Sequence, residues 1–167
     1  VFNKKGEFKG NHRPSTEYPF HWAIYKKRKD ISAIVHAHSP ALIAFSIAGK
    51  VPNTRISPVS FQNCGEIGFA EYASPGSQEL GTSLAEVFSK GFSTVIMENH
   101  GVVTGGPDLI SAFEHMETLE YTARTLLNAK TLGEPHFIES QELLDIWMNP
   151  VFSTQVDAIE VDPQKLE

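Results

Sequence analysis

The sequence predicts an α/β fold, in which helices pack against a β-sheet. Short runs of β-branched and apolar residues, at 33–38 and 94–97, alternate with longer stretches that carry helix start and stop signals. Only residues 98–100 separate the second run from the extended segment 101–104. A connection this short lets the two strands pair as a hairpin, so we expect the sheet to be antiparallel at least in part.

The first third of the chain is expected to form two helices around one strand. Pro14-Ser15-Thr16-Glu17 is typical of a helix start, because it offers hydroxyl N-caps and an early acidic residue. This helix should run to about Arg28, and the strand 33–38 follows it. Ser39-Pro40 then opens a second helix with proline at its first position, and Gly49 ends it.

The middle of the chain is less regular. Residues 51–68 are rich in Pro, Asn, Ser and Gly, which predicts a loop with short strands near 56–61 and 66–70. The turn signal at 74–77 precedes a third helix, expected at 78–90.

The last third is dominated by one long helix. Asp108 follows a Gly-Gly-Pro turn and can cap a helix from 109 to 132. Its apolar residues keep helical spacing and predict a buried stripe: Ile110, Phe113, Met116, Leu119, Ala123, Leu126 and Leu127. A short helix is expected near 141–147. The polar tail after it carries no structural prediction, and Val1-Phe2-Asn3 resembles the end of a strand.

Composition narrows the classes of protein to consider. A chain of 167 residues with 41% hydrophobic residues fits one domain, 1–167, with a substantial core. Twenty acidic against 14 basic residues give a net charge of −6, which argues against nucleic acid as a partner. The one basic run, Lys26-Lys27-Arg28-Lys29, is interpreted as the solvated end of the first helix.

The sequence also predicts the compartment. The single cysteine, Cys64, cannot form an internal disulfide and is typical of the reducing cytosol. No signal peptide and no apolar run near 18 residues is present, so we expect a cytoplasmic protein that does not bind membranes. The first residue is Val1, and we expect the natural chain to extend upstream of it.

Two histidines on the strand 33–38 form the central motif. Side chains two positions apart leave the same face of a strand, and the Cα atoms of His36 and His38 should lie roughly 6.5 Å apart. Imidazole nitrogens at that spacing can converge on one metal ion. Two hydrogen-bonded histidines at the core or rim would give the same pattern, so further ligands are needed to decide.

His100 and Glu17 are the candidates to complete such a site. His100 lies between two predicted strands, beside Gly101, which permits a tight backbone path, and a third imidazole would match the His₃ set of catalytic zinc sites. Glu17 is a candidate acid/base, because a carboxylate beside a divalent ion can move a proton next to a carbonyl. The alternatives are that His100 fills a turn and that Glu17 only stabilises a helix dipole.

Three motifs follow one another along the chain: Pro14-Ser15-Thr16-Glu17, Ile34-Val35-His36-Ala37-His38-Ser39-Pro40 and Met97-Glu98-Asn99-His100-Gly101. The third precedes a helix containing Ala112-Phe113 and Glu117-x-x-Glu120. Together, in the same order and between about Val1 and Thr131, they resemble the class II aldolase/adducin-head family, and its zinc-dependent L-fuculose-1-phosphate aldolases most of all. The resemblance implies a three-layer α/β/α domain with a mainly antiparallel central sheet.

The resemblance also implies roles for individual residues. His36, His38 and His100 would bind one Zn²⁺ per subunit, and Glu17 would transfer the proton. Ser15 and Thr16 match positions that bind the substrate phosphate, which hydroxyls and amides at a helix N-terminus suit. The implied reaction is the reversible cleavage of a ketose 1-phosphate to dihydroxyacetone phosphate and an aldehyde. The implied assembly is a cyclic homotetramer with active sites between subunits.

The sequence departs from the fuculose aldolases in three places. The family's N-terminal helix and Gly-Asn phosphate loop would lie upstream of Val1, no matching tyrosine stands near Ile56 and Ser57, and none follows Tyr121. Pentulose-phosphate 4-epimerases of the family carry Asp where Glu17 stands, which favours an aldolase. A sugar-phosphate dehydratase or decarboxylase of the family remains an alternative. A non-catalytic adducin-head-like module is a further one, although the three histidines argue against it.

Overall fold

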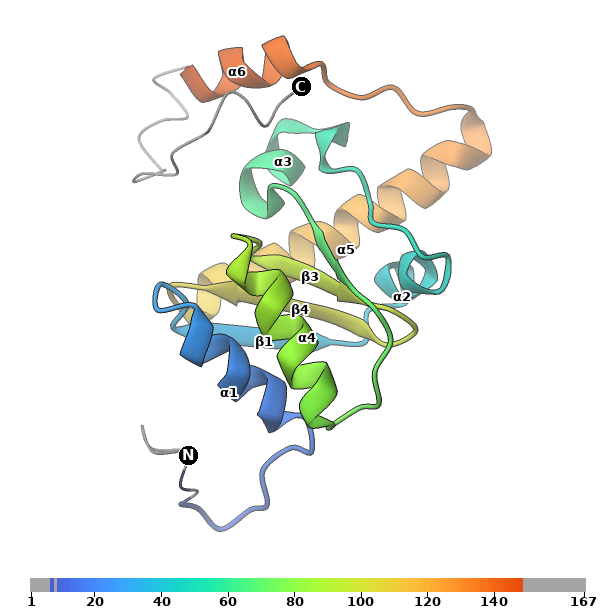
Figure 1. Ribbon diagram of the computed structural model, residues 1–167. Helices are drawn as coiled ribbons and strands as arrows, with labels where there is room; N and C mark the ends of the chain where they lie inside the picture. Colours follow the sequence, from blue (N-terminus) through green and yellow to red (C-terminus); the bar gives the residue numbers. More distant parts are fainter. Residues whose placement is uncertain (1–6, 8, 149–167) are drawn as a thin grey trace.

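A four-stranded sheet lies between two layers of helices in the computed structural model, which describes residue 7 and residues 9–148 (Figure 1). The strands are β1 (Ala33–Ala37), β2 (Gly68–Ala70), β3 (Thr94–Met97) and β4 (Gly101–Gly106). The helices are α1 (Tyr18–Lys27), α2 (Pro40–Ile47), the 3₁₀ helix η1 (Thr54–Ile56), α3 (Pro58–Cys64), α4 (Gln78–Ser89), α5 (Leu109–Leu132) and α6 (Ser140–Met148). The predicted three-layer α/β/α architecture is confirmed.

The sheet is mainly antiparallel. Its strand order is β1-β4-β3-β2, and β4 pairs antiparallel with both of its neighbours, whereas β2 is parallel to β3. The predicted hairpin is therefore confirmed as β3–β4. On the other side of β4, the ladder with β1 ends at the pair Ala37↔Val102, so His38 lies one residue beyond the strand.

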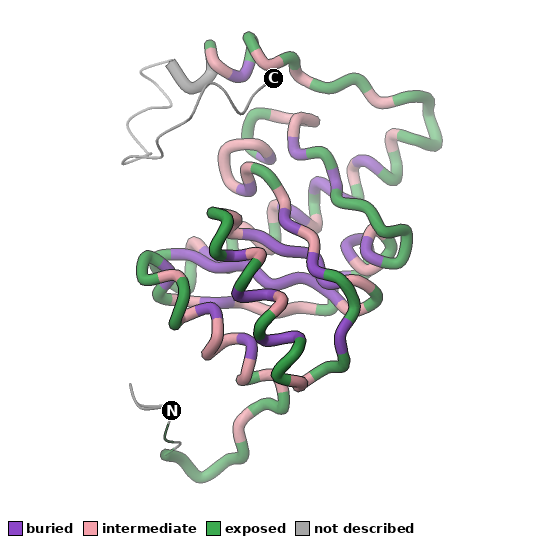
Figure 2. Tube along the Cα trace, viewed as in Figure 1, coloured by how far each residue is buried: buried purple, intermediate pink, exposed green. Residues whose placement is uncertain are grey.

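The two faces of the sheet support two separate parts of the core, and alternate residues of the central strands point into each. On one face Val95 and Val103 pack with the side chains of α1 and α4, Phe20 and Phe88 among them. Figure 2 shows the buried residues along the strands and on the sides of the helices that face them. The other face packs Ile96 and Val102, among others, against α2, α3 and α5.

Most predicted helices have the expected bounds. The helices expected at 40–48, 78–90 and 109–132 are observed as α2, α4 and α5. Asp108 caps α5 as predicted, because its carboxylate accepts a hydrogen bond from the amide of Ser111 at 2.8 Å. The first helix begins later than predicted, with Glu17 itself at the N-cap position of α1.

The strand predicted at 56–61 was wrong, because η1 and α3 occupy that stretch. Ser57 caps α3 through its hydroxyl, which accepts from the amide of Ser60, and Pro58 stands at the first helical position. This Ser-Pro start repeats the signal that opens α2. The strand predicted at 66–70 exists as the shorter β2.

The predicted apolar stripe of α5 is buried only in part. Leu119 and Ala123 are fully buried, but Ile110 is 71% exposed and Phe113 47% exposed. The buried residues of α5 are Ala112, Leu119, Thr122, Ala123 and Leu126, and the first of them lies over β4, because the hydroxyl of Thr104 donates to its carbonyl oxygen at 2.6 Å. Ile110 and Phe113 stand on either side of Ala112 in the sequence and, at about 100° per residue, leave other sides of the helix. Leu127 is likewise 41% exposed.

The basic run at the end of α1 is solvated except at Arg28. The three lysines are exposed, but the guanidinium of Arg28 donates to the carbonyl oxygens of Phe88 and Phe92, at 3.0 and 2.8 Å. Its other nitrogens bind the carboxylate of Asp30. Arg28 therefore ties the end of α1 to the end of α4, which the interpretation of the run as a solvated helix end did not foresee.

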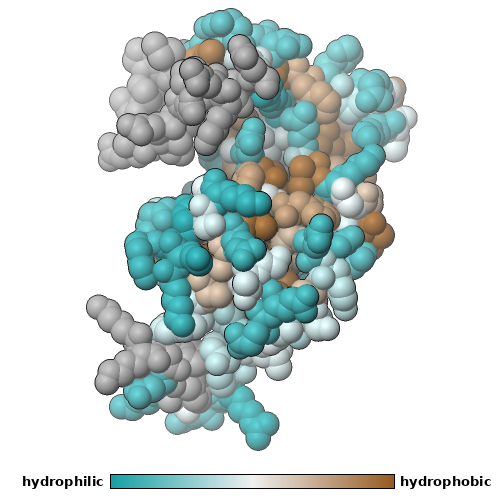
Figure 3. Space-filling view, viewed as in Figure 1, coloured by the Kyte–Doolittle hydropathy of each residue, from teal (hydrophilic) through white to brown (hydrophobic). Residues whose placement is uncertain are grey.

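The sheet ends at β2, whose outer edge has no neighbouring strand among the described residues. Figure 3 shows hydrophobic residues gathered at the centre of the viewed face, between α4 and α3.

No helix in the described part of the chain combines the length and apolarity that crossing a bilayer requires. The predictions for residues 1–3 and for the tail after 148 fall outside the described residues.

Candidate metal centre and active site

Four side chains from three separate stretches meet at one point. Glu17 precedes α1, His36 lies in β1, His38 follows that strand, and His100 lies in the β3–β4 turn. One ligand atom from each lies within 4.8 Å of the others. The structure thus brings together the carboxylate and the three imidazoles that the sequence singled out.

The two histidines of the central motif are close neighbours, as their spacing predicted. Their ring centroids lie 4.8 Å apart, and the two Nε2 atoms are separated by 3.1 Å. The buried ring of Phe20 meets the ring of His36 edge-on, with centroids 5.4 Å apart, and so fixes its plane from the side of α1.

The turn that carries His100 is held at both ends. The amide of His100 donates to the carbonyl of Met97 at 3.2 Å, and Asn99 adopts φ +52°, a left-handed conformation that asparagine tolerates. Glu98 fixes the turn from outside, because its amide donates to Ala70 and its carboxylate accepts from the amide of Tyr72, both at 2.9 Å.

A backbone carbonyl determines the tautomer of His36. The Nδ1 atom lies 2.9 Å from the carbonyl oxygen of Val102. A carbonyl can only accept, so Nδ1 carries the proton and Nε2 of the neutral ring holds the lone pair. Metal-binding histidines are commonly oriented by such a second contact, and this one aims Nε2 of His36 at the cluster.

The donor set fits a divalent cation. The Nε2 atom of His36 lies 2.8 Å from Oε2 of Glu17 as well as 3.1 Å from Nε2 of His38. Lone pairs and a carboxylate oxygen this close need a positive charge between them, either a proton or a metal ion. Ligand atoms of a tetrahedral zinc site lie roughly 3.3 Å apart, which the imidazole pair nearly matches.

His100 completes the cluster from the side of the turn. Its Nε2 lies 3.0 Å from Oε1 of Glu17, so one carboxylate contacts two of the three imidazoles. The Nδ1 atom of His100 is buried and has no hydrogen-bond partner among the described residues. Its orientation therefore depends on the turn and on the contact with Glu17.

Burial keeps two of the imidazoles in the form that metals bind. Desolvation is the largest cause that lowers the pKa of His36 and of His100, and the negative charge of Glu17 opposes it in both. Both rings are therefore neutral at pH 7, with a lone pair available.

His21 follows Glu17 by one helical turn, a spacing at which it could either orient the carboxylate or pack as a helix histidine. The ring packs, stacked on Phe20 with centroids 4.5 Å apart. Burial, with a smaller effect of His36, lowers its pKa from 6.5 to about 4, against the opposing charge of Glu17. His21 therefore belongs to the support around the cluster, as a neutral packed side chain.

The pKa of His21 predicts a pH-dependent stability. In the unfolded chain His21 binds a proton below about pH 6.5, whereas in the folded protein it does so only below about pH 4. The free energy of unfolding therefore falls as the pH drops through this window. We expect H21N to flatten this loss, measured as melting temperature at half-unit pH steps. The exposed His136 provides the control, because H136N should reproduce the wild-type slope. Equal slopes for H21N and wild type would contradict the prediction.

The two hydroxyl residues assigned to phosphate lie beside Glu17 at the surface. Ser15 and Thr16 are exposed, and the Ser15 hydroxyl accepts from the amide of Glu17 at 3.2 Å. The amide of Tyr18 donates to the carbonyl of Ser15, and Pro19 has no amide hydrogen. These first amides of α1 are thus used or absent, and the side-chain hydroxyls are the groups left to face an anion.

Gly101 permits the approach of β4 to the end of β1. A Cβ atom at this position would lie 2.5 Å from the carbonyl oxygen of Ala37 and 3.1 Å from the ring of His38. The backbone of Gly101 itself needs no positive φ, so the requirement is space and not conformational freedom.

Replacing Gly101 by alanine is expected to weaken metal binding and to destabilise the fold by about 1–3 kcal/mol through overpacking. The measurements are zinc affinity by competition with a chelating dye and thermal unfolding. G105A is the matched control, because Gly105 lies on the same strand as Gly101 but away from the cluster. A Cβ atom at Gly105 would lie 2.6 Å from the side chain of Ile31. The prediction fails if both variants bind zinc alike.

A sheet covered on both faces by helices, with three histidines and a glutamate beside the end of β1, defines a class of α/β/α proteins with a His₃-carboxylate site. Residues 2–127 match the family described as Class II Aldolase and Adducin N-terminal domain, and the chain belongs to this family. The resemblance seen in the three sequence motifs is thereby confirmed.

Relatives with different activities are similar to this chain. A 3-oxo-tetronate 4-phosphate decarboxylase of Haemophilus influenzae is 36% identical over 128 residues, which are 74% of this chain and 60% of that protein. An L-fuculose phosphate aldolase of Methanocaldococcus jannaschii is 37% identical over 117 residues, 70% of this chain and 62% of that protein. The chain thus spans about three fifths of the length of these relatives.

A solved structure supports the same grouping. An L-fuculose 1-phosphate aldolase superposes with a TM-score of 0.75 at 30% identity, covering 86% of this chain and 67% of the other. Class II aldolases depend on a metal ion, and the four-residue cluster could hold one.

Two supporting groups were missed by the sequence reasoning. The carbonyl of Val102 orients His36, and the carboxylate of Glu98 holds the turn of His100. A backbone carbonyl leaves no trace in residue identity. Glu98 belongs to the third sequence motif, and its position in the turn is the one sequence signal that could have predicted its supporting role.

Proposed function

We propose that this chain carries the catalytic centre of a zinc-dependent lyase that cleaves a sugar phosphate. The observation that carries the proposal is the contact of the Glu17 carboxylate with Nε2 of both His36 and His100, at 2.8 and 3.0 Å. A carboxylate serving only a helix dipole would have no reason to lie between two neutral imidazoles.

Three imidazoles would hold the ion. His36, His38 and His100 supply the His₃ set typical of catalytic zinc, which leaves a position open for water or substrate. When bound, a divalent ion polarises a carbonyl oxygen and stabilises negative charge beside it. His38 is the exposed member of the set, so a small substrate could reach the cluster from the side of this residue.

Glu17 would move the proton. Its side chain is 14% exposed, so it is largely shielded from water and still reachable by a small substrate. In the cleavage of a ketose 1-phosphate to dihydroxyacetone phosphate and an aldehyde, the hydroxyl that becomes the aldehyde loses one proton to a base or to water, and the released carbon gains one. Glu17, in its protonated form, would deliver the proton to that carbon. In the reverse direction the same carboxylate would remove it.

Ser15 and Thr16 would contact the phosphate. Both are exposed within two residues of Glu17, and their hydroxyls can donate to phosphate oxygens. The family frame adds a cytoplasmic cyclic homotetramer with active sites between subunits. Large exposed apolar side chains, such as Ile110 and Phe113, are compatible with subunit contacts.

Decarboxylation of a sugar-acid phosphate is the second candidate. The similarity to a 3-oxo-tetronate 4-phosphate decarboxylase at 36% identity favours it. Both reactions break a carbon–carbon bond next to a carbonyl and leave a carbon that must be protonated, so the same four residues would serve either one. A dehydratase needs the same cluster as well, whereas an adducin-like structural module would not need it.

Product analysis separates these candidates. The purified protein, supplied with stoichiometric Zn²⁺, is incubated with L-fuculose 1-phosphate and, separately, with 3-oxo-tetronate 4-phosphate. We expect dihydroxyacetone phosphate from the first substrate; carbon dioxide from the second would establish the alternative. Absence of bound zinc together with absence of turnover on both substrates would overturn the proposal.

A further inference from the structure

His38 is the histidine of the cluster whose backbone is not held by the sheet. The β1–β4 ladder ends at Ala37, and the His38 side chain has no hydrogen bond to the protein backbone among the described contacts, in contrast to that of His36. The direction of His38 therefore depends on how the chain continues into α2, which begins two residues later.

The start of α2 is held in an unusual way. The N-cap residue Ser39 makes no capping bond with its side chain, and Pro40 has no amide hydrogen. The amides of Ala41 and Leu42, the next two donors without a helical partner, donate to Oε1 and Oε2 of Glu120, at 3.3 and 3.2 Å. One carboxylate from α5 thus replaces the local cap of α2.

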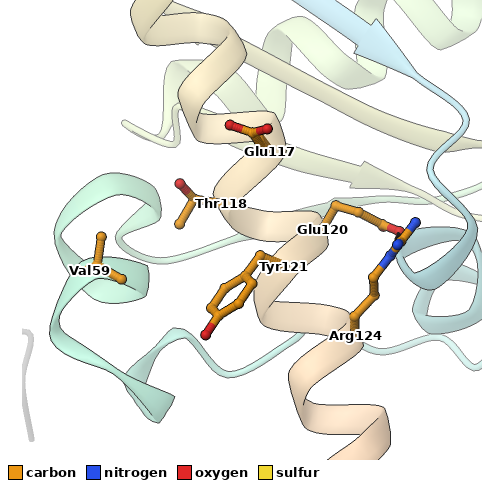
Figure 4. A pocket seen from close by; sticks show the side chains of 6 residues that line it. All are labelled: Val59, Glu117, Thr118, Glu120, Tyr121 and Arg124. Carbon is orange, nitrogen blue, oxygen red and sulfur yellow. Dashed lines mark hydrogen bonds and ion pairs between the residues drawn. The ribbon is translucent and has the colours of Figure 1, made fainter.

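Glu120 is itself fixed in place. Its side chain is only 13% exposed, and Nε of Arg124, one turn further along α5, lies 2.7 Å from Oε1. Figure 4 shows both side chains extending from α5 on the side of α2. A second link joins the same elements, because the hydroxyl of Ser39 lies 3.6 Å from the sulfur of Met116.

We propose that Glu120 is a positioning residue of the metal centre, which holds the chain after His38 and so directs that imidazole to the cluster. The carboxylate binds the backbone three and four residues beyond His38. Helix α5 follows β4, which begins directly after His100. The two hydrogen bonds from Ala41 and Leu42 to Glu120, here called the clamp, therefore connect the segments that carry His38 and His100. This inference rests on the proposed metal function.

The test uses Co²⁺, whose visible absorption spectrum reports the number and geometry of its ligands. E120A and E120Q are compared with wild type in Co²⁺ affinity, Co²⁺ spectrum and melting temperature. D108A is the matched control, because it also removes a carboxylate that caps a helix, at the start of α5. R124Q is a second control that leaves the carboxylate in place.

We expect E120A to bind Co²⁺ about tenfold more weakly, with an altered spectrum. The Co²⁺ affinity of E120Q should fall between those of E120A and wild type. The glutamine amide has one oxygen to accept hydrogen bonds, whereas both oxygens of the Glu120 carboxylate accept them. D108A should lower the melting temperature but keep the wild-type affinity and spectrum. Wild-type Co²⁺ binding by E120A, or an equal loss in D108A, would overturn this inference alone. A wild-type protein that binds no Co²⁺ would overturn the metal centre and this inference together.

Discussion

Replacing Glu17 by glutamine is expected to lower turnover about 10²–10⁴-fold while the bound metal is retained. The amide keeps the size of the side chain but cannot carry a proton between substrate and solvent. The three imidazoles remain, so the metal content should stay stoichiometric. The measurements are steady-state turnover on the sugar phosphate that the wild type cleaves and elemental analysis of the purified variant.

An exposed carboxylate gives the matched control for this variant. Glu114 lies on the surface of α5, and E114Q should turn over like the wild type. Full activity in E17Q would reduce Glu17 to a helix-end charge with no part in the reaction. Loss of metal together with activity would instead make the carboxylate a ligand, which the short contacts to His36 and His100 also permit.

Replacing His38 by alanine is expected to abolish metal binding and activity together. Only two of the three imidazoles remain in this variant, so the His₃ set of the proposed site is incomplete. Because His38 is exposed, its removal should cost little folding stability, and the loss can be assigned to the site. Zinc competition with a chelating dye and turnover at saturating zinc measure the two effects.

The control for H38A is a histidine far from the cluster in the sequence. His136 is exposed and lies in the segment before α6, so H136A should bind zinc and react like the wild type. Tight, stoichiometric zinc binding by H38A would show that His38 is not a ligand. The interpretation of His36 and His38 as a pair of metal ligands on one strand would then be wrong.

The location of the cluster could be inferred from sequence because its signals are local. A strand places two histidines two positions apart on one face, and a hairpin returns a third one to the same end of the sheet. The supporting contacts could not be inferred. The clamp between Glu120 and the amides of Ala41 and Leu42 joins positions nearly 80 residues apart in the sequence. No pattern in either segment predicts a contact with the other.

The errors in the fold have the same origin. The strand expected at 56–61 was drawn from composition, although Ser57-Pro58 repeats the start signal of α2 and in fact caps α3. The stripe of α5 was drawn from periodicity, which does not decide which line of apolar residues faces the sheet. The buried line includes Ala112, Leu119 and Ala123, so Ile110 and Phe113 are exposed on other sides of the helix.

The origin of the cluster in three distant stretches has a consequence for handling the protein. An ion held by His36, His38 and His100 would cross-link the end of β1 and the β3–β4 hairpin, much as a reversible covalent bridge would, with Glu17 at the entrance of α1 beside it. Free ion at a hundred times its dissociation constant would add about 2.7 kcal/mol to the unfolding free energy. Chelators should therefore make the protein heat-labile, and returning the ion should restore its resistance to heat.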